Sequence, residues 1–402
     1  MSGTAAPPDE AGIIAEVAAA HDSATPLEIG GCFTKRAMLR PVQAGRGLSL
    51  AACAGITLHS PQELVIGAKA GTRMSEIAAA VAAHGQHIIS EPPDFSGLFG
   101  GGAAQTLGGV VAANLSGPRR VAWGATRDHV LGVRAVNGQG ELVRSGGRVL
   151  KNVTGLDLCK LLAGSHGTLA VLTEITLKVL PAPERRGTVV LPGLDATQGV
   201  AALSAALGSP YGVSAAAYLP AEAASQVPAL AWLGGPVAIA RVEDFATSVA
   251  YRTDRLRAEL ASFGRAEILD DAASVAAWAA VRDAVPLHGE TGAIWRVSVR
   301  PSAGPAVAES VARAFAANWF LDWGGGLVWI AGPATAAAHE AVMAAAKAGG
   351  GTWLLLRAPE GLRASVAVIP PEPPALARIT AAVKAAFDPK GILNPGRMYA
   401  GV

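Results

Sequence analysis

The chain has 402 residues, which predicts two or three domains or one large α/β unit with an insertion, and its net charge is only +2, from 33 Lys and Arg against 31 Asp and Glu. Because the positive and negative charges nearly cancel, there is no electrostatic argument for a nucleic-acid or anionic-membrane partner. Charged residues are 16% of the chain, below the usual value of about 25%, while apolar residues are 51% and can fill a full core. The low charge fits either an Ala-rich composition or a surface that partner subunits cover, because interface cores are poor in charge.

Cysteine use and hydrophobic patterning restrict the metal chemistry and the location. Cys32, Cys53 and Cys159 are scattered, so they form no spacing typical of zinc or an iron–sulfur cluster, and the sparse count suits a reducing cytoplasm. The uncharged stretches 95–118 and 197–221 contain glycines or prolines and lack the pattern of a membrane span. The beginning of the chain lacks the basic and apolar regions of a signal peptide. We therefore expect a cytoplasmic protein without a bound metal, which reaches a membrane only through partner subunits.

Short strands and helices alternate in the first part of the chain. The pattern predicts a helix over 12–19, strands over 26–29 and 63–70, a helix from Met74 that Gly85 stops, and a strand over 87–89. Two runs around the turn sequence Asn137-Gly138-Gln139-Gly140 predict a hairpin over 130–144. A helix over 156–162, a turn over 164–167 and an alternating strand over 169–180 follow.

The best predicted domain boundary is Pro181-Ala182-Pro183-Glu184-Arg185-Arg186, which combines prolines with a charge run. Beyond it we expect helices over 201–207, 244–263, 305–317 and 335–348, separated by strands over 237–241, 294–299 and 327–331. This alternation predicts an α+β second domain. A final helix over 374–387 leads into a terminal sequence that contains Asn394-Pro395-Gly396-Arg397-Met398.

Two glycine-rich segments are the strongest candidates for a ligand site. Glycines at 97, 100–102, 108, 109, 117 and 124 are too frequent for helix or strand interiors, and they let the backbone approach a ligand. Thr106-Leu107-Gly108-Gly109 opens a predicted helix whose N-terminal amides favour anions, and Gly30-Gly31-Cys32-Phe33-Thr34-Lys35 follows the first strand. For either segment alone, tight turns of a glycine-rich protein are an equally good explanation. Neither matches the G-x-G-x-x-G or the G-x-x-x-x-G-K-[ST] nucleotide motif.

The order of the motifs over residues 25–183 resembles the flavin domain of the vanillyl-alcohol-oxidase (PCMH-type) flavoprotein family. The matching segments are 30–35, Glu91-Pro92-Pro93, 106–109, Ser116-Gly117-Pro118, 124–128, 151–158 and 164–174. The terminal sequence 387–398 resembles the segment with which this family returns to the flavin. Within the family, Gly117-Pro118-Arg119-Arg120, 321–325 and 394–400 resemble the FAD-binding subunits of bacterial glycolate oxidases, which are glycolate dehydrogenases.

The resemblance implies an α+β fold with three parts. A two-subdomain PCMH-type FAD-binding domain covers 1–183, an α+β cap domain 184–372, and a C-terminal helix with a flavin-contacting tail 373–402. The FAD diphosphate is expected between 30–35 and 106–118, the adenine near Val171, and the isoalloxazine near Asn394. The cofactor-binding residues carried over are Gly30, Gly31, Cys32, Phe33, Thr34, Lys35, Pro92, Pro93, Thr106, Gly108, Gly109, Ala112, Ser116, Gly117, Arg127, Gly167, Val171 and Asn394.

Departures from the family pattern bear on the cofactor. Cys32 and Phe33 stand in the phosphate loop where many relatives have further small residues. No histidine lies in that loop, so we expect non-covalent FAD. Gly108 is expected at a contact between backbone and phosphate, with a positive φ. His166 is interpreted as a turn residue.

No residue is assigned a catalytic role. Larger relatives that oxidise 2-hydroxy acids place clustered histidines and acids in the second domain, whereas this one offers only His288 and His339, far apart in sequence. Asp270-Asp271 fits a helix N-cap pair. Two dipeptides, Trp295-Arg296 and Asp322-Trp323, fit either a carboxylate pocket or the core.

The resemblance therefore implies an FAD-binding subunit of a complex that oxidises glycolate to glyoxylate by hydride transfer to flavin. Because no base is evident, we expect the chain to relay electrons or to support the assembly. Its partners are then a larger flavin-bearing catalytic subunit and an iron–sulfur subunit. A self-sufficient FAD-dependent 2-hydroxy-acid oxidase and a structural subunit that has lost flavin are the two alternatives.

Overall fold

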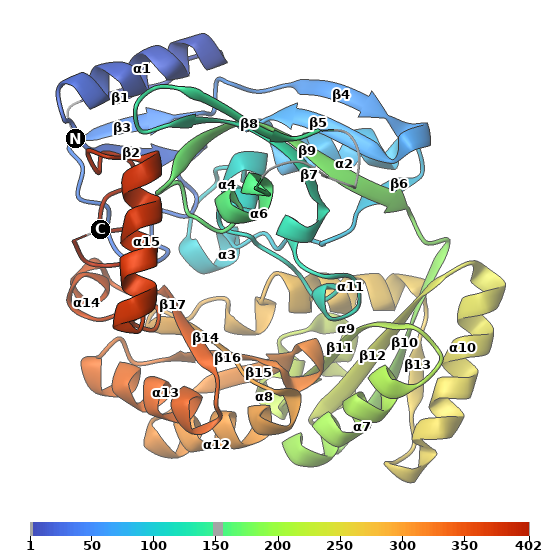
Figure 1. Ribbon diagram of the computed structural model, residues 1–402. Helices are drawn as coiled ribbons and strands as arrows, with labels where there is room; N and C mark the ends of the chain where they lie inside the picture. The colour runs from blue at the N-terminus through green and yellow to red at the C-terminus, as the bar shows by residue number, and fades with distance from the viewer. Residues whose placement is uncertain (1–2, 148–155, 402) are drawn as a thin grey trace.

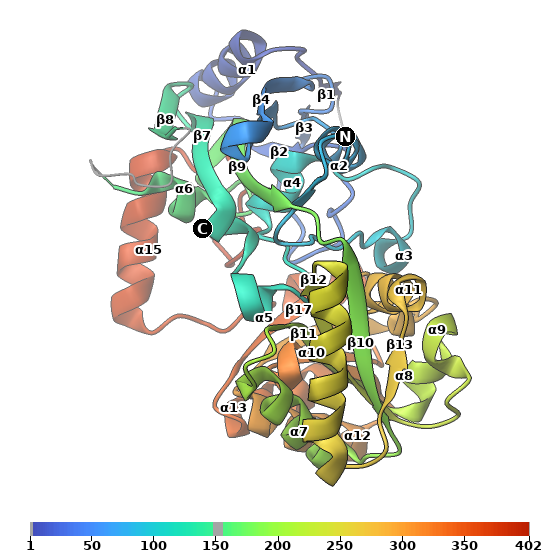
Figure 2. The same ribbon diagram turned by 90° about the vertical axis from the view of Figure 1, so that its right-hand side faces the viewer.

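The chain forms a first domain and a cap in the computed structural model, which describes residues 3–147 and 156–401. Figure 1 shows the first domain above and the cap below, with the C-terminal segment returning to the first domain beside the N-terminus. Figure 2 shows that strands of the two domains follow one another directly, where β9 leads into β10. The predicted α+β class is confirmed.

Two sheets build the first domain. The smaller is parallel and has the order β1 (Thr4–Ala5), β3 (Arg46–Ser49) and β2 (Leu27–Gly30). The larger is antiparallel and has the order β4 (Ile56–Ser60), β5 (Val65–Lys69), β9 (Ala170–Pro181), β7 (Val130–Asn137) and β8 (Leu142–Gly146), with β6 (Gln86–Ile88) paired to the far end of β9. The helices of this domain are α1 (Glu10–Asp22), α2 (Met74–Ala82), α3 (Ser96–Phe99), α4 (Leu107–Ala112), α5 (Arg120–Trp123) and α6 (Leu158–Leu162).

An eight-stranded antiparallel sheet forms the cap. Its order is β13 (Glu267–Leu269), β10 (Arg185–Pro192), β12 (Val237–Asp244), β11 (Val213–Leu219), β15 (Asn318–Asp322), β16 (Leu327–Gly332), β14 (Ala293–Ser298) and β17 (Thr352–Arg357). The helices of the cap are α7 (Ala196–Gly208), α8 (Ala221–Ser225), α9 (Pro228–Ala231), α10 (Ala246–Glu259), α11 (Asp271–Arg282), α12 (Gly304–Ala314) and α13 (Ala336–Ala348). No helix among the described residues is long and apolar enough to cross a membrane.

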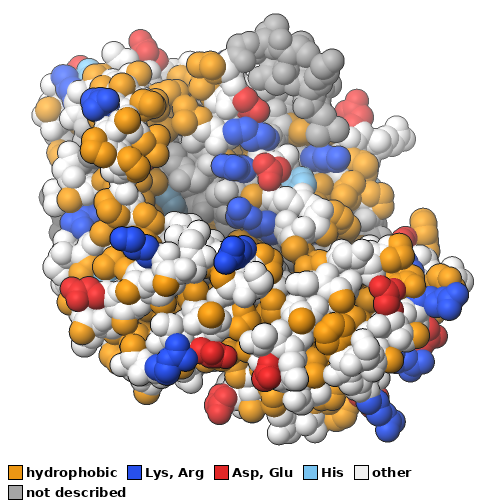
Figure 3. Space-filling view, turned by 60° about the horizontal axis from the view of Figure 1, so that its bottom comes forward, with side chains coloured by type: hydrophobic (Ala, Val, Ile, Leu, Met, Phe, Trp, Pro, Cys, Tyr) orange, Lys and Arg blue, Asp and Glu red, His pale blue; other side chains and the backbone are white. Residues whose placement is uncertain are grey.

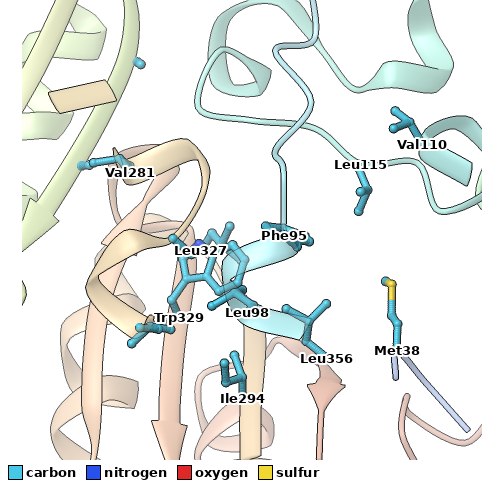
Figure 4. Close-up of a cluster of buried hydrophobic side chains, with 14 of the residues drawn as sticks. Met38, Phe95, Leu98, Val110, Leu115, Val281, Ile294, Leu327, Trp329 and Leu356 are labelled. Atoms are coloured by element: carbon cyan, nitrogen blue, oxygen red, sulfur yellow. The ribbon is translucent and has the colours of Figure 1, made fainter. Parts of the chain in front are cut away.

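The two faces of the cap sheet differ in chemistry. Trp295 on β14 packs with Phe315 and donates to His339 of α13, so the alternate residues of that strand face the helices. Arg296 therefore points to the opposite face, as does its cross-strand neighbour Trp329. Trp329 meets Phe95 of the first domain, with ring centroids 5.6 Å apart, and Figure 4 shows both side chains in one cluster. One face thus packs on helices, and the other carries polar residues toward the first domain.

Four side chains, which we call the interdomain charge cluster, join the two domains; Arg119, Arg241 and Glu243 are buried and Glu91 is partly buried. Glu91 of the first domain accepts hydrogen bonds from both Nη atoms of Arg241 on β12, at 3.0 and 2.9 Å. Arg119 of the first domain donates to both carboxylate oxygens of Glu243, also on β12, at 3.0 and 2.6 Å. The pairs are reciprocal, since each domain supplies one acid and one arginine, and the summed charge is zero. Bidentate geometry of this kind fixes orientation as well as distance.

The C-terminal segment completes the first domain. After α14 (Glu360–Ser365) and α15 (Pro374–Phe387), the amide of Leu27 donates to the carbonyl of Ile392 at 2.7 Å, and Leu393 pairs alongside β2. The buried Lys384 of α15 anchors this return by donating to Asp388 at 2.7 Å. The final helix predicted over 374–387 is confirmed residue for residue.

Several predicted boundaries are wrong for local reasons. The helix expected from residue 156 begins at Leu158, because Asp157 caps it by accepting from the amide of Lys160. The helix expected over 305–317 ends at Ala314, because Phe315 is extended. The helix expected over 244–263 starts only at Ala246, since β12 continues to Asp244. The predicted boundary at 183 falls between β9 and β10.

We predict that Glu243→Gln destabilises the protein by about 3–5 kcal/mol, because it leaves two buried arginines without their shared carboxylate. The pKa of Glu243 is lowered to about 2 against the desolvation that burial imposes, chiefly by Arg241 and Arg119. The folding stability that ionised Glu243 contributes is therefore fully present at neutral pH, and it is lost as the pH falls from about 4.3 toward 2. Urea unfolding at pH 7 measures it. The exposed Glu259→Gln is the control, and a loss below about 1 kcal/mol for Glu243→Gln contradicts the prediction.

Candidate functional site

The loop over 30–35 and the start of α4 enclose a narrow cavity. Gly31 is so close to Thr106 that a Cβ atom would lie 2.1 Å from its Oγ1, so only glycine fits between β2 and α4. The cavity beside them is lined by Gly30, Gly31, Cys32, Phe33, Thr34, Lys35, Thr106, Gly109, Ala112, His166, Asn394 and Arg397, among others. A second cavity continues from it and adds Gly108, Gly167, Ala170 and Leu172.

The backbone conformation of Gly108 differs from the positive φ that the sequence analysis expects there. It lies inside α4 and does not have a positive φ. A Cβ atom there would lie 2.8 Å from the Cβ of Ala70 and 3.0 Å from its carbonyl oxygen. The glycine is therefore required by the close packing of α4 on the end of β5, besides lining the second cavity. The α4 helix has only six residues, so a positive N-terminal dipole is a minor part of this site.

Lys35 is the main cation of the cavity. Its Nζ lies 3.3 Å from Oε1 of Gln105 and 3.4 Å from Oγ1 of Thr34, and it makes no ion pair among the described residues. Burial lowers the pKa of Lys35 to about 8. A partly buried ammonium whose hydrogen-bond partners are neutral oxygens is desolvated at some cost, and an anion placed beside it would offset that cost.

The third wall of the cavity comes from two distant segments that meet. Asn394 accepts from the amide of Ile29 at 2.7 Å and donates to the carbonyl of His166 at 2.8 Å. Both Asn394 and His166 have positive φ values, +43° and +53°, which are strained for non-glycine residues. Burial, together with Arg397 and Lys35, lowers the pKa of His166 to about 3, so the imidazole is neutral at physiological pH.

The sequence prediction missed part of this wall. The sequence predicts His166 as a turn residue, which it is, but the residue also lines both cavities. Arg397 was seen only as part of a motif. Its guanidinium donates to the carbonyls of Lys35, Arg36 and Arg40 and so holds the phosphate loop in place. The positive φ of His166 is a signal that becomes visible only in the structure.

Of the residues carried over by resemblance, the structure brings twelve to the two cavities and leaves six outside their linings. Those that line them are Gly30, Gly31, Cys32, Phe33, Thr34, Lys35, Thr106, Gly108, Gly109, Ala112, Gly167 and Asn394. Those outside are Pro92, Pro93, Ser116, Gly117, Arg127 and Val171. Val171 is fully buried, and its neighbours Ala170 and Leu172 face the cavity instead because β9 alternates. The matching segment 151–155 lies outside the described residues.

Pro92 lines a different space, an interdomain cavity of about 600 Å³ between α2, β6 and α11. Four arginines line this cavity as well, but each forms an ion pair with an acid: Arg119, Arg186, Arg241 and Arg282. Its charges are therefore satisfied within the protein. The cavity beside Lys35 differs from it in having a cation that lacks such a partner.

The two histidines and the aspartate of the cap that the sequence analysis singles out have either structural roles or exposed positions. His339 is buried and accepts from Trp295 Nε1 at 3.0 Å, which makes it part of the core. His288 is exposed and lies beside Gly97. Asp270 caps α11 by accepting from Ala273 at 2.9 Å, as predicted. Among the described residues, no group of three His, Cys, Asp or Glu side chains could hold a metal ion.

Asp322 is the exception among the acids of the cap. It ends β15 on the face toward the first domain, and its Oδ1 accepts from the amide of Trp323 at 2.7 Å. Burial raises the pKa of Asp322 to about 7, against the opposing effect of that hydrogen bond and of Arg296. The next residue, Trp323, has a φ of +52° and donates from Nε1 to the carbonyl of Gly117 at 3.1 Å. The residue that follows the titratable Asp322 carboxyl group, Trp323, is thus hydrogen-bonded to a loop of the first domain.

We predict that Asp322 makes the stability of the cofactor-free protein fall with rising pH. Its folded pKa of about 7 exceeds the unfolded value of about 3.9, so the stability that it contributes is present below pH 4 and lost as the pH rises to 7. Asp322→Asn should therefore gain at least about 1 kcal/mol over the wild type between pH 5 and pH 8. Urea unfolding at both pH values measures the difference. The exposed Asp254→Asn serves as control, and parallel pH profiles for the wild type and Asp322→Asn would disprove the shift.

Comparisons with known proteins agree with this geometry. Residues 1–146 match the family described as an FAD binding domain. The chain is 33% identical over 393 residues to "Glycolate oxidase subunit GlcE" of Escherichia coli (strain K12), which covers 96% of this chain and 97% of that protein. It is 39% identical over 99 residues to "Glycolate oxidase subunit GlcD" of Bacillus subtilis (strain 168), which covers 25% of this chain and 20% of that protein.

The fold has solved counterparts. The crystal structure of p-cresol methylhydroxylase with substrate bound superposes with a TM-score of 0.71 at 13% identity, covering 98% of this chain and 88% of that chain. At this identity the likeness shows the fold alone, which is that of the PCMH-type flavoproteins. Together with the near full-length match to the first relative, it places the chain: it belongs to the family of glycolate oxidase GlcE subunits.

Proposed function

We propose that this chain is the FAD-binding subunit of a glycolate oxidase complex and holds FAD non-covalently in the cavity beside Lys35. The observation that carries the proposal is the partly buried ammonium of Lys35, which lacks a carboxylate partner in the described part of the chain and lines a glycine-rich space. A diphosphate supplies the anion that this site lacks. The FAD binding domain match over residues 1–146 covers both cavity-forming loops.

The chain's own groups have distinct tasks in this proposal. Lys35 and the backbone of Gly30 and Gly31 would hold the diphosphate, and Asn394 would fix the loop by its bonds to Ile29 and His166. FAD, when bound, supplies a two-electron acceptor for the hydride of a 2-hydroxy acid. The neutral ring of His166 adds no charge to the cavity at physiological pH.

A subunit role is supported by the surface. Figure 3 shows one face on which hydrophobic side chains are widespread and charged ones are scattered among them. The helix α15 lies at the margin of the molecule in Figures 1 and 2, and its Leu376 and Ile379 are 47% and 60% exposed. Similarity to both GlcE and GlcD proteins supports a multi-subunit assembly, in which we propose a larger flavin-bearing catalytic subunit and an iron–sulfur subunit. Any membrane association would then pass through these partners.

One observation favours a second candidate, a self-sufficient 2-hydroxy-acid oxidase. The Asp322 carboxyl group has a pKa near 7 and faces the first domain, so it has the proton affinity that a general base needs. Turnover separates the two candidates: brisk glycolate oxidation by the isolated chain supports the oxidase. Activity that appears only on co-expression with the neighbouring subunits supports the subunit.

We predict that Lys35→Met weakens FAD binding by about 10- to 100-fold, because a hydrogen bond to a charged group contributes about 1.5–3 kcal/mol. The FAD-free protein should be as stable as the wild type or more stable, since the desolvated ammonium is gone. FAD titration and thermal unfolding of the stripped protein measure the two effects. Lys347→Met, on the exposed side of α13, should change neither. Equal loss of FAD affinity and of apo stability would assign Lys35 a structural role instead.

We also predict that acid precipitation of the purified chain releases the yellow chromophore into the supernatant. Among the described residues that line the cavity the one histidine is His166, which has a positive φ, and the loop over 30–35 contains none. Mass spectrometry of the precipitated chain should show the mass of the polypeptide without a flavin adduct. Colour that stays with the pellet contradicts non-covalent binding, and a chain purified without colour supports the structural subunit.

A further inference from the structure

Gln105, which lies just before α4, contacts the Lys35 ammonium from outside the loop over 30–35. Two oxygens accept from Lys35 Nζ among the described residues: Oε1 of Gln105 at 3.3 Å and Oγ1 of Thr34 at 3.4 Å. Thr34 belongs to the same loop as the lysine, so Gln105 is the partner that ties the ammonium to another segment. A Cβ atom on Gly109 would lie 3.6 Å from the same Nζ. Gln105 therefore keeps the end of the lysine side chain beside the start of α4, which lines both cavities of the site.

The side chain of Gln105 is itself fixed on its other side. It is 9% exposed, and its Nε2 donates to the carbonyl of Pro93 at 3.0 Å. The amide of the next residue, Asp94, donates to Oδ1 of Asp283 at the end of α11 in the cap, at 2.8 Å. Because one end of the amide group donates and the other accepts, the two bonds agree on a single orientation, with the oxygen toward the ammonium.

The oxygen that Gln105 presents is neutral, so it orients the ammonium without pairing its charge. Burial lowers the pKa of Lys35 to about 8, and the electrostatic effects of Asp94 and Cys32 act against this decrease. The other charged or titratable groups that line the cavity are Glu28, Arg36, His166 and Arg397. A carboxylate in place of the Gln105 amide would form an ion pair with Lys35 and compete with an incoming anion.

We infer that Gln105 is a positioning residue for the cofactor, which holds the Lys35 ammonium toward the glycine-lined cavity and leaves its charge available to a diphosphate. The inference rests on the proposed function, and it adds a residue outside the motifs that the sequence analysis matches to the family. Gln105 acts through Lys35, so its effect on FAD binding depends on the lysine. An amide and a carboxylate have nearly the same size, and Gln105→Glu therefore separates this role from the filling of space.

The test measures FAD binding to the cofactor-free full chain by flavin fluorescence from about pH 6.5 to about pH 9.5. In the wild type, the affinity should fall as the pH rises through about 8, because Lys35 then loses its charge. Gln105→Glu should weaken FAD binding by about 10- to 100-fold near neutral pH. It should also move the fall to a higher pH, because the new carboxylate raises the pKa of Lys35.

Gln86→Glu is the matched control. Gln86 is 7% exposed, and its Nε2 likewise donates to a proline carbonyl, that of Pro61 at 2.7 Å. The same chemical change is thus made at a buried glutamine that does not line the Lys35 cavity. Gln86→Glu should keep the FAD affinity and the pH profile of the wild type. A loss of affinity in Gln105→Glu that is equal at every pH indicates a structural role and overturns the inference.

A double-mutant cycle tests whether Gln105 acts through Lys35. Gln105→Asn shortens the side chain by one methylene group and adds no charge, and it should weaken FAD binding by about 3- to 10-fold. In the Lys35→Met background the same substitution should cause no further loss, because the group that it positions is absent. Equal losses in both backgrounds overturn the inference, and this comparison holds even if Gln105→Glu does not fold.

NMR of the FAD-free chain separates a failure of this inference from a failure of the proposed function. The lysine Cε signals report the pKa of Lys35, whose signal is assigned by its loss in Lys35→Met. A Lys35 titration that is the same in the wild type and in Gln105→Glu overturns the inference, whether or not FAD binds. A wild-type chain that binds no FAD, while Gln105→Glu raises the pKa of Lys35, overturns the proposed function and leaves the role of Gln105 toward Lys35 standing.

Discussion

The reciprocal pairing of two acids and two arginines across the domain boundary is the constraint on which the other features depend. Glu91 and Arg119 come from loops of the first domain, while Arg241 and Glu243 stand on one strand of the cap. Each pair is bidentate and largely shielded from solvent. A rotation of either domain would therefore break the pairs and leave unpaired charges in the low-dielectric interior of the protein. The positive φ of Glu91, +48°, shows that the backbone also accepts strain to keep this geometry.

Lys35 and Arg296 differ from the fully buried cations. Lys35 lies in the first domain and Arg296 lies where the cap meets it, and neither makes an ion pair among the described residues. By contrast, the buried Lys384 has Asp388, and the buried Arg363 donates to the carbonyls of Leu39 and Ala358. Because a desolvated cation without a partner is costly, a bound anion would lower that cost at Lys35.

Much of the first domain and the cavity-lining position of the loop over 30–35 could be predicted from the sequence, because glycine and turn motifs act locally. The sequence positions of Gly31 and Thr106 indicate two loops, but only the packing of β2 against α4 brings them into contact. The role of Arg397 depends on the return of the chain over more than three hundred residues to the carbonyl of Lys35, which no local pattern encodes. In the cap, the sequence does not predict β10, β11, β15 or β17: β11 is Ala-rich and fully buried, and the other three contain adjacent buried residues instead of an alternation. Arg241 makes ion pairs and Arg296 makes none among the described residues. This difference likewise depends on tertiary neighbours, which the sequence pattern does not predict.

The return of the C-terminal segment also makes one wall of the cavity depend on contacts between distant parts of the chain. Asn394 and Arg397, which hold the loop around Lys35, each contact a residue more than three hundred positions earlier in the sequence. The entropic cost of closing a loop rises with its length, so these contacts form at a larger entropic cost than the local turns of the first domain. The wall is consequently sensitive to any change that weakens the pairing of Leu393 with β2, even where the core of the first domain stays intact.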